Sequence, residues 1–499
     1  MRLCVATPTP ATRVAAIAST VRAREPCSGC GAGPAAGAGL DNGGVLIAFS
    51  IPRALVCRCG ALCCRPAASL RRVSPTPSLK PFAPKGVRMV IAQADVTAQL
   101  DAARREQFPR GAALTLDDLT LAGREGVLDD LREHEPVTWM PALGGWLVTS
   151  RDAAREVLSP TAPMTVEVEQ NMVRNSLGPM MLTSDGESHD AQRRPFEAPF
   201  RNRDIELRYG ERISALAHRL IDDLGPAAHA GEPFDLGARF ASPFAVLMAG
   251  ELLGLSLTDT ERIDGFYSDF AGAMEYSGDP EPMRRADVAR AELTAILLEE
   301  LEAARRAPGH SLTSQVANDA SHGLSDDELA AQLRVVLFGA IETIQASVMN
   351  TLYLLAQHPD QEAAAMDDRT LLGGAQEEAR RLIPPVSFIE RWTAAPVTIA
   401  GIEVPAREFV GVSVLAANRD PAHFDDPLRF DLARANASRS LSFSFGVHAC
   451  LGLHLARAQT TGAITALWDR LGRLRVVEAA EPEGFAFRKP AVMRVASQK

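Results

Sequence analysis

Hydrophobic positions recur with a helical period over most of the chain from about Val96 onward. The clearest segment begins at Ser325, whose hydroxyl can cap a helix while Glu328 returns the contact in a capping box. The segment stays apolar to about Gln357, and a proline follows at position 359. At 1.5 Å per residue this pattern predicts a helix roughly 50 Å long, enough to cross a whole domain.

Strand patterns are fewer and shorter. Two occur at residues 136–140 and 145–149, and three more follow Pro385 at residues 397–400, 402–404 and 409–414, separated by Gly and Pro. Helical character returns at residues 451–471. We therefore predict a mainly α protein of the α+β class with a small β region.

Residues 1–88 show neither period and are rich in Ala, Gly, Pro, Arg and Cys. They hold twelve basic residues against two acidic ones, although the whole chain has a net charge of −10. We interpret 1–88 as a low-complexity basic, Cys-rich extension and 89–499 as the folded domain. Three explanations of the extension remain open: a start assigned too far upstream, with Met89 as the alternative; a disordered leader; or a targeting segment resembling a transit peptide.

Seven of the eight cysteines precede residue 65. Among them, the pair Cys27 and Cys30 followed by Cys57, Cys59, Cys63 and Cys64 could supply zinc thiolates. Only Cys450 lies in the main body, which can therefore hold no internal disulfide, and a cytoplasmic location is expected. The acidic body argues against nucleic acid as a partner. No stretch reaches the roughly 20 apolar residues of a membrane span.

Cys450 follows a glycine-containing loop and precedes a helix that we expect to start near Leu451. Backbone N–H groups and the positive helix end would stabilise a thiolate there. Gly446 and Gly452 would let the loop turn and let a flat ligand approach the backbone. Taken alone, Cys450 fits equally well an inert buried cysteine on a helix.

The loop resembles the haem-binding loop of cytochromes P-450. The family's Phe, Gly, Cys and Gly positions are matched by Phe443, Gly446, Cys450 and Gly452, whereas Ser444 stands where many bacterial members have glycine. The resemblance covers about residues 95–499. It implies the triangular, mainly helical P-450 fold, with Cys450 as the axial ligand of a haem b iron.

A second motif lies upstream, where two Glu-x-x-Arg frames overlap. The i,i+3 spacing places each pair on one helix face, a pattern that is usually solvated surface. The family motif has Pro four residues after its Arg, which favours the frame ending before Pro385 over Glu377 and Arg380. The family's third residue lies in a Pro-x-x-Phe-x-x-x-Arg stretch. The resemblance thus implies a structural ion triad of Glu378, Arg381 and Arg434.

Haem propionates require cations, and the chain has candidates in positions similar to those of the family. Each of them alone could be an ordinary surface residue, but their joint order favours a role in cofactor binding, because charge-assisted bonds to carboxylates are strong. The candidates are His189, Arg193, Arg391 and His448.

Within the long helix, a pair of small residues precedes Glu342 and Thr343. Small residues let a helix open, and a threonine there can share its hydroxyl with a ligand. The family's distal helix has a similar motif, which implies that Glu342 and Thr343 deliver protons and argues against the peroxide-using branch. Ala340 and Ile344 depart from the usual Gly and Thr. The alternative interpretation is a helix with one polar stripe.

The resemblance implies a monooxygenase that inserts one oxygen atom of O2 into a lipophilic small molecule, giving a hydroxylated or epoxidised product. The Cys450 thiolate would favour O–O cleavage. Electrons from NAD(P)H would come through a separate ferredoxin or flavodoxin with its reductase, docked on a basic patch including Arg193 and Arg457. The alternatives are a P-450 that couples or rearranges substrates, and a haem-binding protein without turnover.

Substrate contacts can be predicted only by position, from the segments 171–182, 386–389 and 485–487 and one face of the long helix. Their apolar, adaptable side chains suit a lipophilic ligand. The residues expected in the pocket are Met180, Met181, Leu337, Phe338, Val386 and Phe388.

Overall fold

The computed structural model describes residues 99–120, 124–257, 259–275 and 279–498, all of which belong to one compact unit, Ala83–Lys499. The extension 1–88 lies outside the described residues, and with it the possible zinc ligands and the alternative start at Met89. Among the described residues no group of three or more His, Cys, Asp or Glu side chains is arranged to hold a metal ion.

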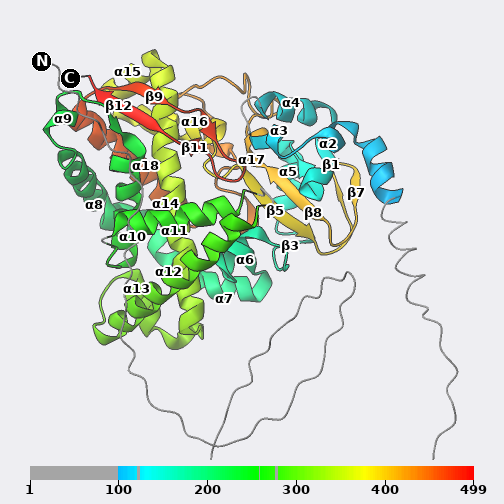
Figure 1. Ribbon diagram of the computed structural model, residues 1–499, viewed down its shortest axis with the longest axis horizontal. Helices are drawn as coiled ribbons and strands as arrows, with labels where there is room; N and C mark the ends of the chain where they lie inside the picture. The colour runs from blue at the N-terminus through cyan, green and yellow to red at the C-terminus, as the bar shows by residue number, and fades with distance from the viewer. Residues whose placement is uncertain (1–98, 121–123, 258, 276–278, 499) are drawn as a thin grey trace, which may run out of the picture. The chain divides into compact units, whose positions relative to one another are not determined.

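Helices dominate the described chain (Figure 1), as the periodicity predicted. A first helix covers residues 99–107. The others are α2 (Pro109–Ala113), α3 (Asp117–Thr120), α4 (Arg124–His134), α5 (Arg151–Leu158), α6 (Met172–Leu177), α7 (Gly186–Glu197), α8 (Asn202–Asp222), α9 (Pro226–His229), α10 (Ser242–Leu253), α11 (Thr260–Ala273), α12 (Pro280–Arg306), α13 (Leu312–Asn318), α14 (Asp326–Gln357), α15 (Pro359–Asp367), α16 (Leu372–Leu382), α17 (Val414–Ala417) and α18 (Leu453–Leu471).

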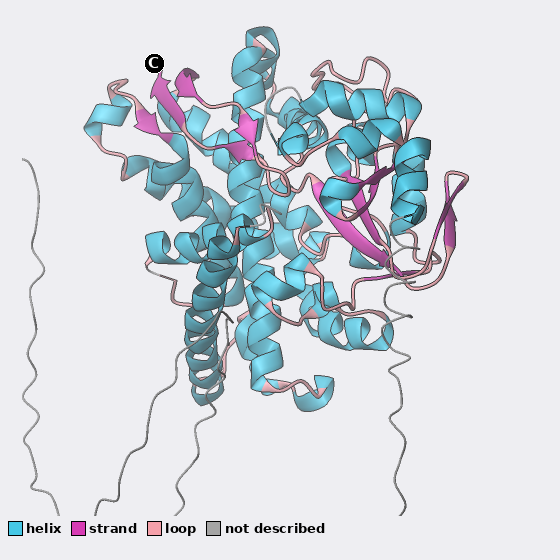
Figure 2. Cartoon of the chain, turned by 45° about the vertical axis from the view of Figure 1, so that its right-hand side comes forward, coloured by secondary structure: helices cyan, strands magenta, loops and turns pink. Residues whose placement is uncertain are grey.

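Strands gather in two places (Figure 2). A five-stranded sheet has the order β1-β2-β8-β5-β3, in which β2 and β8 are parallel, and a three-stranded sheet near the C-terminus has the order β4-β12-β9. The pairs β6-β7 and β10-β11 form two further hairpin-like sheets. The strands are β1 (Val137–Met140), β2 (Gly145–Val148), β3 (Met164–Thr165), β4 (Phe234–Asp235), β5 (Phe388–Thr393), β6 (Val397–Ile399), β7 (Ile402–Val404), β8 (Phe409–Ser413), β9 (Leu474–Ala479), β10 (Pro482–Glu483), β11 (Lys489–Pro490) and β12 (Met493–Ser497).

The long helix α14 begins where the sequence predicted. Ser325 Oγ accepts a hydrogen bond from the Glu328 amide at 3.3 Å, and the Glu328 carboxylate accepts one from the Ser325 amide at 2.8 Å, which completes the capping box. The helix runs without interruption to Gln357, so the opening expected near Glu342 is not seen.

Helix α14 is also the one described helix that is long and apolar enough to cross a membrane. However, 78% of its most apolar window is buried inside the protein, where it packs against α10, α12, α16 and α18. This burial is typical of a core helix. The apolar surface of α14 is therefore used for packing and for the site described next.

Candidate active site

A tight loop between the 3₁₀ turn η8 (Gly446–His448) and α18 carries Cys450. The Cys450 amide donates to the Phe443 carbonyl at 2.9 Å, and the Ala449 amide donates to the Gly446 carbonyl at 3.1 Å. Gly446 has φ +79°, and a β-carbon there would lie 2.2 Å from the Leu158 carbonyl oxygen. Only glycine fits this position, so the loop's shape depends on it.

The helix after the loop begins two residues later than expected, at Leu453, with Gly452 as its N-cap. Cys450 is solvent-exposed and lines a cavity. Burial raises the pKa of the Cys450 thiol, although the Gly452 N–H and the charges of Arg193 and Arg380 lower it. The stabilisation of a thiolate expected from the helix end is therefore smaller than the cost of desolvation.

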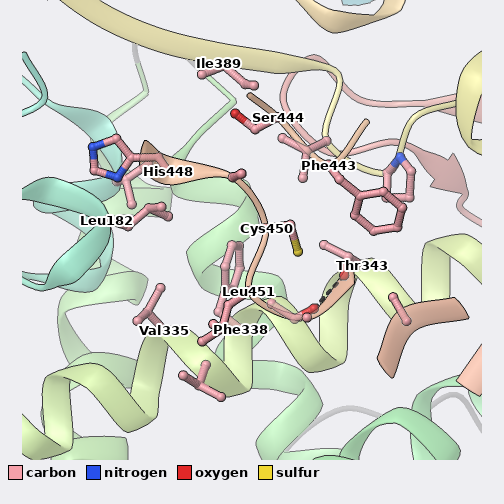
Figure 3. Close-up of a pocket in the computed structure, with 18 of the residues that line it drawn as sticks. Leu182, Val335, Phe338, Thr343, Ile389, Phe443, Ser444, His448, Cys450 and Leu451 are labelled. Carbon is pink, nitrogen blue, oxygen red and sulfur yellow. Dashed lines mark hydrogen bonds between the residues drawn. The ribbon is translucent and has the colours of Figure 1, made fainter. Parts of the chain in front are cut away.

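The cavity has a volume of about 310 Å³ and is mainly apolar. Figure 3 shows the Cys450 sulfur pointing into the space between its own loop and α14. Thr343 lines the cavity from α14, and its hydroxyl donates to the Gly339 carbonyl at 2.5 Å. The apolar lining includes Val166, Val173, Val335, Ile344, Ile389, Leu451 and Phe487.

Two histidines and an arginine line the cavity near the Cys450 loop. The imidazole rings of His189 and His448 lie 4.6 Å apart, and both residues are buried. Neither His189 Nε2 nor His448 Nδ1 has a hydrogen-bond partner in the described part of the chain. Arg391 is 9% exposed, and burial lowers its pKa to about 10. Burial also lowers the pKa of His448.

The Glu378 carboxylate is held by two arginines in a fully buried position. Arg381 Nε and Nη2 donate to its two oxygens at 2.6 and 2.9 Å, and both side chains have 0% exposure. Arg434 Nε lies 3.1 Å from Glu378 Oε1, an ionic contact without the alignment of a hydrogen bond. Arg381 also donates to the carbonyls of Asn418 and Pro427, so the triad fastens α16 to the segment before the Cys450 loop.

The other Glu-x-x-Arg frame, Glu377 and Arg380, forms a second network of ion pairs. The sequence pattern had favoured Glu378 and Arg381 over this frame. Glu377 accepts from Arg380 at 3.0 Å and from Arg457 at 2.7 Å, and so joins α16 to α18. Both guanidinium groups lie over the Phe443 ring, at 5.2 and 5.5 Å from its centroid. Arg380 lines the cavity, and burial lowers its pKa to about 10. The Glu-x-x-Arg spacing of Glu377 and Arg380 could have indicated from the sequence that Arg380 belongs to the site.

Glu342 lies beside Thr343 in α14 but does not line the cavity. Its side chain is 5% exposed, and Oε1 accepts from Lys489 Nζ at 2.6 Å. Oε2 is buried and has no hydrogen-bond partner among the described residues. Glu342 is thus paired with Lys489 and does not line the cavity, whereas Thr343 lies at the cavity wall.

The family model for Cytochrome P450 matches residues 299–471 of the chain. The 6-deoxyerythronolide B hydroxylase of Saccharopolyspora erythraea is 33% identical over 365 residues, which are 69% of this chain and 88% of that protein. The chain belongs to the cytochrome P-450 family. It is a cytochrome P-450 monooxygenase with the P-450 fold.

Two further comparisons agree with this assignment. The mycinamicin IV hydroxylase/epoxidase of Micromonospora griseorubida is 31% identical over 393 residues, covering 76% of this chain and 96% of that protein. A solved structure of a mutant of P-450 EryK in complex with erythromycin B has a TM-score of 0.67 and 29% identity, with coverage of 75% and 96%. The names of these relatives do not favour a non-catalytic haem-binding protein.

Haem is the cofactor of the P-450 family, and the residues around the cavity fit it. A sulfur faces the cavity, as an axial ligand must. Two unpartnered imidazole nitrogens and the buried Arg391 line the same cavity, and such groups need anionic or polar partners. The two carboxylates of haem would supply those partners.

The structure brings most of the predicted site residues to this cavity. Gly446 does not line it, because its conformation serves the contact with Leu158. The predicted residues that line it are Thr343, His189, Arg193, Arg391, Phe443, His448, Cys450, Gly452, Met181, Phe338, Val386 and Phe388.

The prediction of pocket contacts was wrong for Met180 and Leu337, which are 1% and 0% exposed in the hydrophobic core and do not line the cavity. Positions two residues apart on a helix differ by about 200°, so Leu337 points away from Val335 and Gly339, which do line it. Periodicity alone could not tell which apolar face of α14 meets the ligand.

Sequence reasoning missed two acids that hold the cavity walls. Glu390 accepts from the Met172 amide at 2.8 Å, at the start of α6. Glu275 accepts from the amides of Phe485, Ala486 and Phe487 at 2.5, 3.3 and 3.3 Å. Both contacts join segments more than 200 residues apart, so no local pattern could indicate them.

Proposed function

We propose that Cys450 is the axial ligand of the haem iron and that the chain hydroxylates or epoxidises a lipophilic small molecule in the cytoplasm. One observation carries this proposal: the sole thiol in the described part of the chain faces an apolar cavity that buried cations also line. The names of the hydroxylase and hydroxylase/epoxidase relatives support the reaction type.

The protein's contribution is ligation, orientation and exclusion of water. Haem, when bound, supplies the activation of dioxygen. Cys450 would hold the iron, while His189, Arg193, Arg391 and His448 would hold the carboxylates of the cofactor. The apolar walls orient the substrate and keep water away from the reacting position.

Protons reach the cavity through α14 in this proposal. Thr343 presents its hydroxyl at the cavity wall and can exchange its bond to the Gly339 carbonyl for one to a ligand. Glu342 is the adjacent acid and would supply the proton that Thr343 passes on.

Electrons come from NAD(P)H through a separate ferredoxin or flavodoxin with its reductase. The predicted docking arginines are both engaged: Arg193 donates to the Ala449 carbonyl at 2.9 Å and contacts Glu197, and Arg457 is paired with Glu377. Arg457 is 33% exposed and remains available to an acidic donor at the rim. Arg457→Gln should slow reduction by the donor protein, and an unchanged electron-transfer rate would exclude this docking site.

The optical spectrum of the reduced carbon monoxide complex tests the proposed function. The wild-type protein should give the long-wavelength band of thiolate-ligated haem, and Cys450→Ser should abolish it. A globin-like band in the wild type, or an intact thiolate band in C450S, would reject the assignment of Cys450.

A further inference from the structure

Lys489 makes an unusual contact with the buried acid next to the cavity. It lies in β11 and donates from Nζ to Glu342 Oε1 at 2.6 Å and to Gln345 Oε1 at 3.2 Å, both on α14. Gln345 in turn donates to Asp264 of α11. Lys489 is the only lysine in the described part of a chain that otherwise relies on arginine.

The two members of the ion pair differ in their access to solvent. The Glu342 side chain is 5% exposed and the Lys489 side chain is 26% exposed. Glu342 does not line the cavity. Lys489 is therefore the member of the pair that solvent reaches, and it contacts Glu342 directly.

The type of side chain is as informative as its position. A lysine ammonium can release a proton to a neighbouring acceptor, whereas an arginine guanidinium stays protonated in proteins. Arginine would also supply a positive charge, but it could not release a proton. The use of lysine at this one described position thus points to proton transfer in addition to charge pairing.

We propose that Lys489 loads protons onto Glu342 for delivery to Thr343. The Lys489 Nζ–H bond breaks and an O–H bond forms on Glu342 Oε1, which leaves a neutral amine and a neutral carboxylic acid. A hydronium ion from bulk solvent returns a proton to the amine and becomes water. The O–H bond of the Glu342 acid then breaks and its proton goes to the Thr343 oxygen, while the Thr343 hydroxyl gives its own proton to the acceptor in the cavity. Glu342 is a carboxylate again, and one proton has moved inward from solvent. This role rests on the proposed function of Glu342 and Thr343.

Two substitutions separate proton transfer from charge pairing. Lys489→Met removes both, whereas Lys489→Arg keeps the positive charge but cannot release a proton. In the holoenzyme with its electron donor, both variants should yield about tenfold less product per NAD(P)H consumed, with more peroxide, because general acid catalysis is lost. Arg494→Met, which removes an exposed charge from nearby β12, is the matched control and should behave like wild type. Wild-type coupling in K489R or in K489M would overturn the proposal.

A second measurement needs no turnover. The chain has four lysines, so the ¹⁵N-lysine-labelled holoprotein gives at most four side-chain signals, and that of Lys489 is identified by its loss in K489R. Glu342→Gln should shift this signal and no other. An unchanged signal in E342Q would overturn the proposal, while the carbon monoxide spectrum would still report separately on Cys450.

Discussion

Residues of the Cys450 loop that look equivalent in the sequence differ in backbone conformation. Gly446 needs its positive φ and has no room for a β-carbon, whereas Gly452 has an ordinary φ of −85° and its nearest contact would be the Cys450 sulfur at 3.9 Å. Ser444 is a third case, with φ +61° in the left-handed region that favours glycine. Glycine would adopt this conformation without the steric cost of a β-carbon.

Ser444→Gly should relieve the backbone strain caused by the left-handed conformation at this position. An L-residue in the left-handed conformation costs about 1–2 kcal/mol, and glycine's added chain freedom costs roughly 0.5–1 kcal/mol. Relative to the control Ser444→Ala, which keeps the β-carbon, S444G should raise the free energy of unfolding by about 1 kcal/mol in denaturant titrations. A less stable S444G would contradict the strain at this position.

Among the helices and strands, buried carboxylates join segments that are far apart in the sequence. Glu378 ties α16 to the chain before the Cys450 loop, and Glu377 ties α16 to α18. The two differ in exposure, since the Glu378 side chain is 0% exposed and the Glu377 side chain is 12% exposed. Glu378 is the more deeply buried of the two, so removal of its charge leaves its arginine partners desolvated and unpaired.

Glu378→Gln should therefore destabilise the protein by about 3 kcal/mol, because Arg381 keeps a buried charge without its carboxylate. The control Glu302→Gln, which removes the carboxylate of an exposed pair with Arg306 in α12, should cost less. Urea unfolding of the two variants measures the difference. Equal losses of unfolding free energy in the two variants would show that burial does not determine how much the triad contributes to stability.

A second prediction concerns Glu275, which holds the turn at residues 485–487 against the end of α11. Burial raises its pKa above the usual 4.5, although three backbone N–H groups and Arg124 lower it. A carboxyl group with a raised pKa in the folded state stabilises the fold below its ordinary pKa, and this contribution is lost as the pH rises.

Glu275→Gln cannot ionise, so the free energy of unfolding of the wild type minus that of E275Q should fall as the pH rises above about 4.5 and be flat below it. Denaturant titrations across this pH range measure the slope. A difference that grows with pH would mean that the hydrogen bonds and Arg124 outweigh the burial of Glu275.

At the scale of the whole molecule, charge divides the chain between a basic extension and an acidic body. The described residues that line the cavity lie between Val166 and Phe487. We therefore propose that residues 89–499 form the haem domain.

A chain that starts at Met89 should bind haem and give the same carbon monoxide spectrum as the full chain. Zinc content, measured on both forms, tests the possible thiolate site at Cys27 and Cys30 at the same time. Loss of haem binding in the shorter chain would overturn this division.

Short spacings along the chain were enough to predict the capping box at Ser325, the i,i+3 pairs of α16 and the Cys450 loop. Tertiary structure decided which face of α14 meets the cavity, which carboxylates hold its walls, and that Glu342 is paired with Lys489, 147 residues away. Local geometry is set by neighbouring residues along the chain, whereas contacts of this kind exist only once the hydrophobic core has fixed the elements in place.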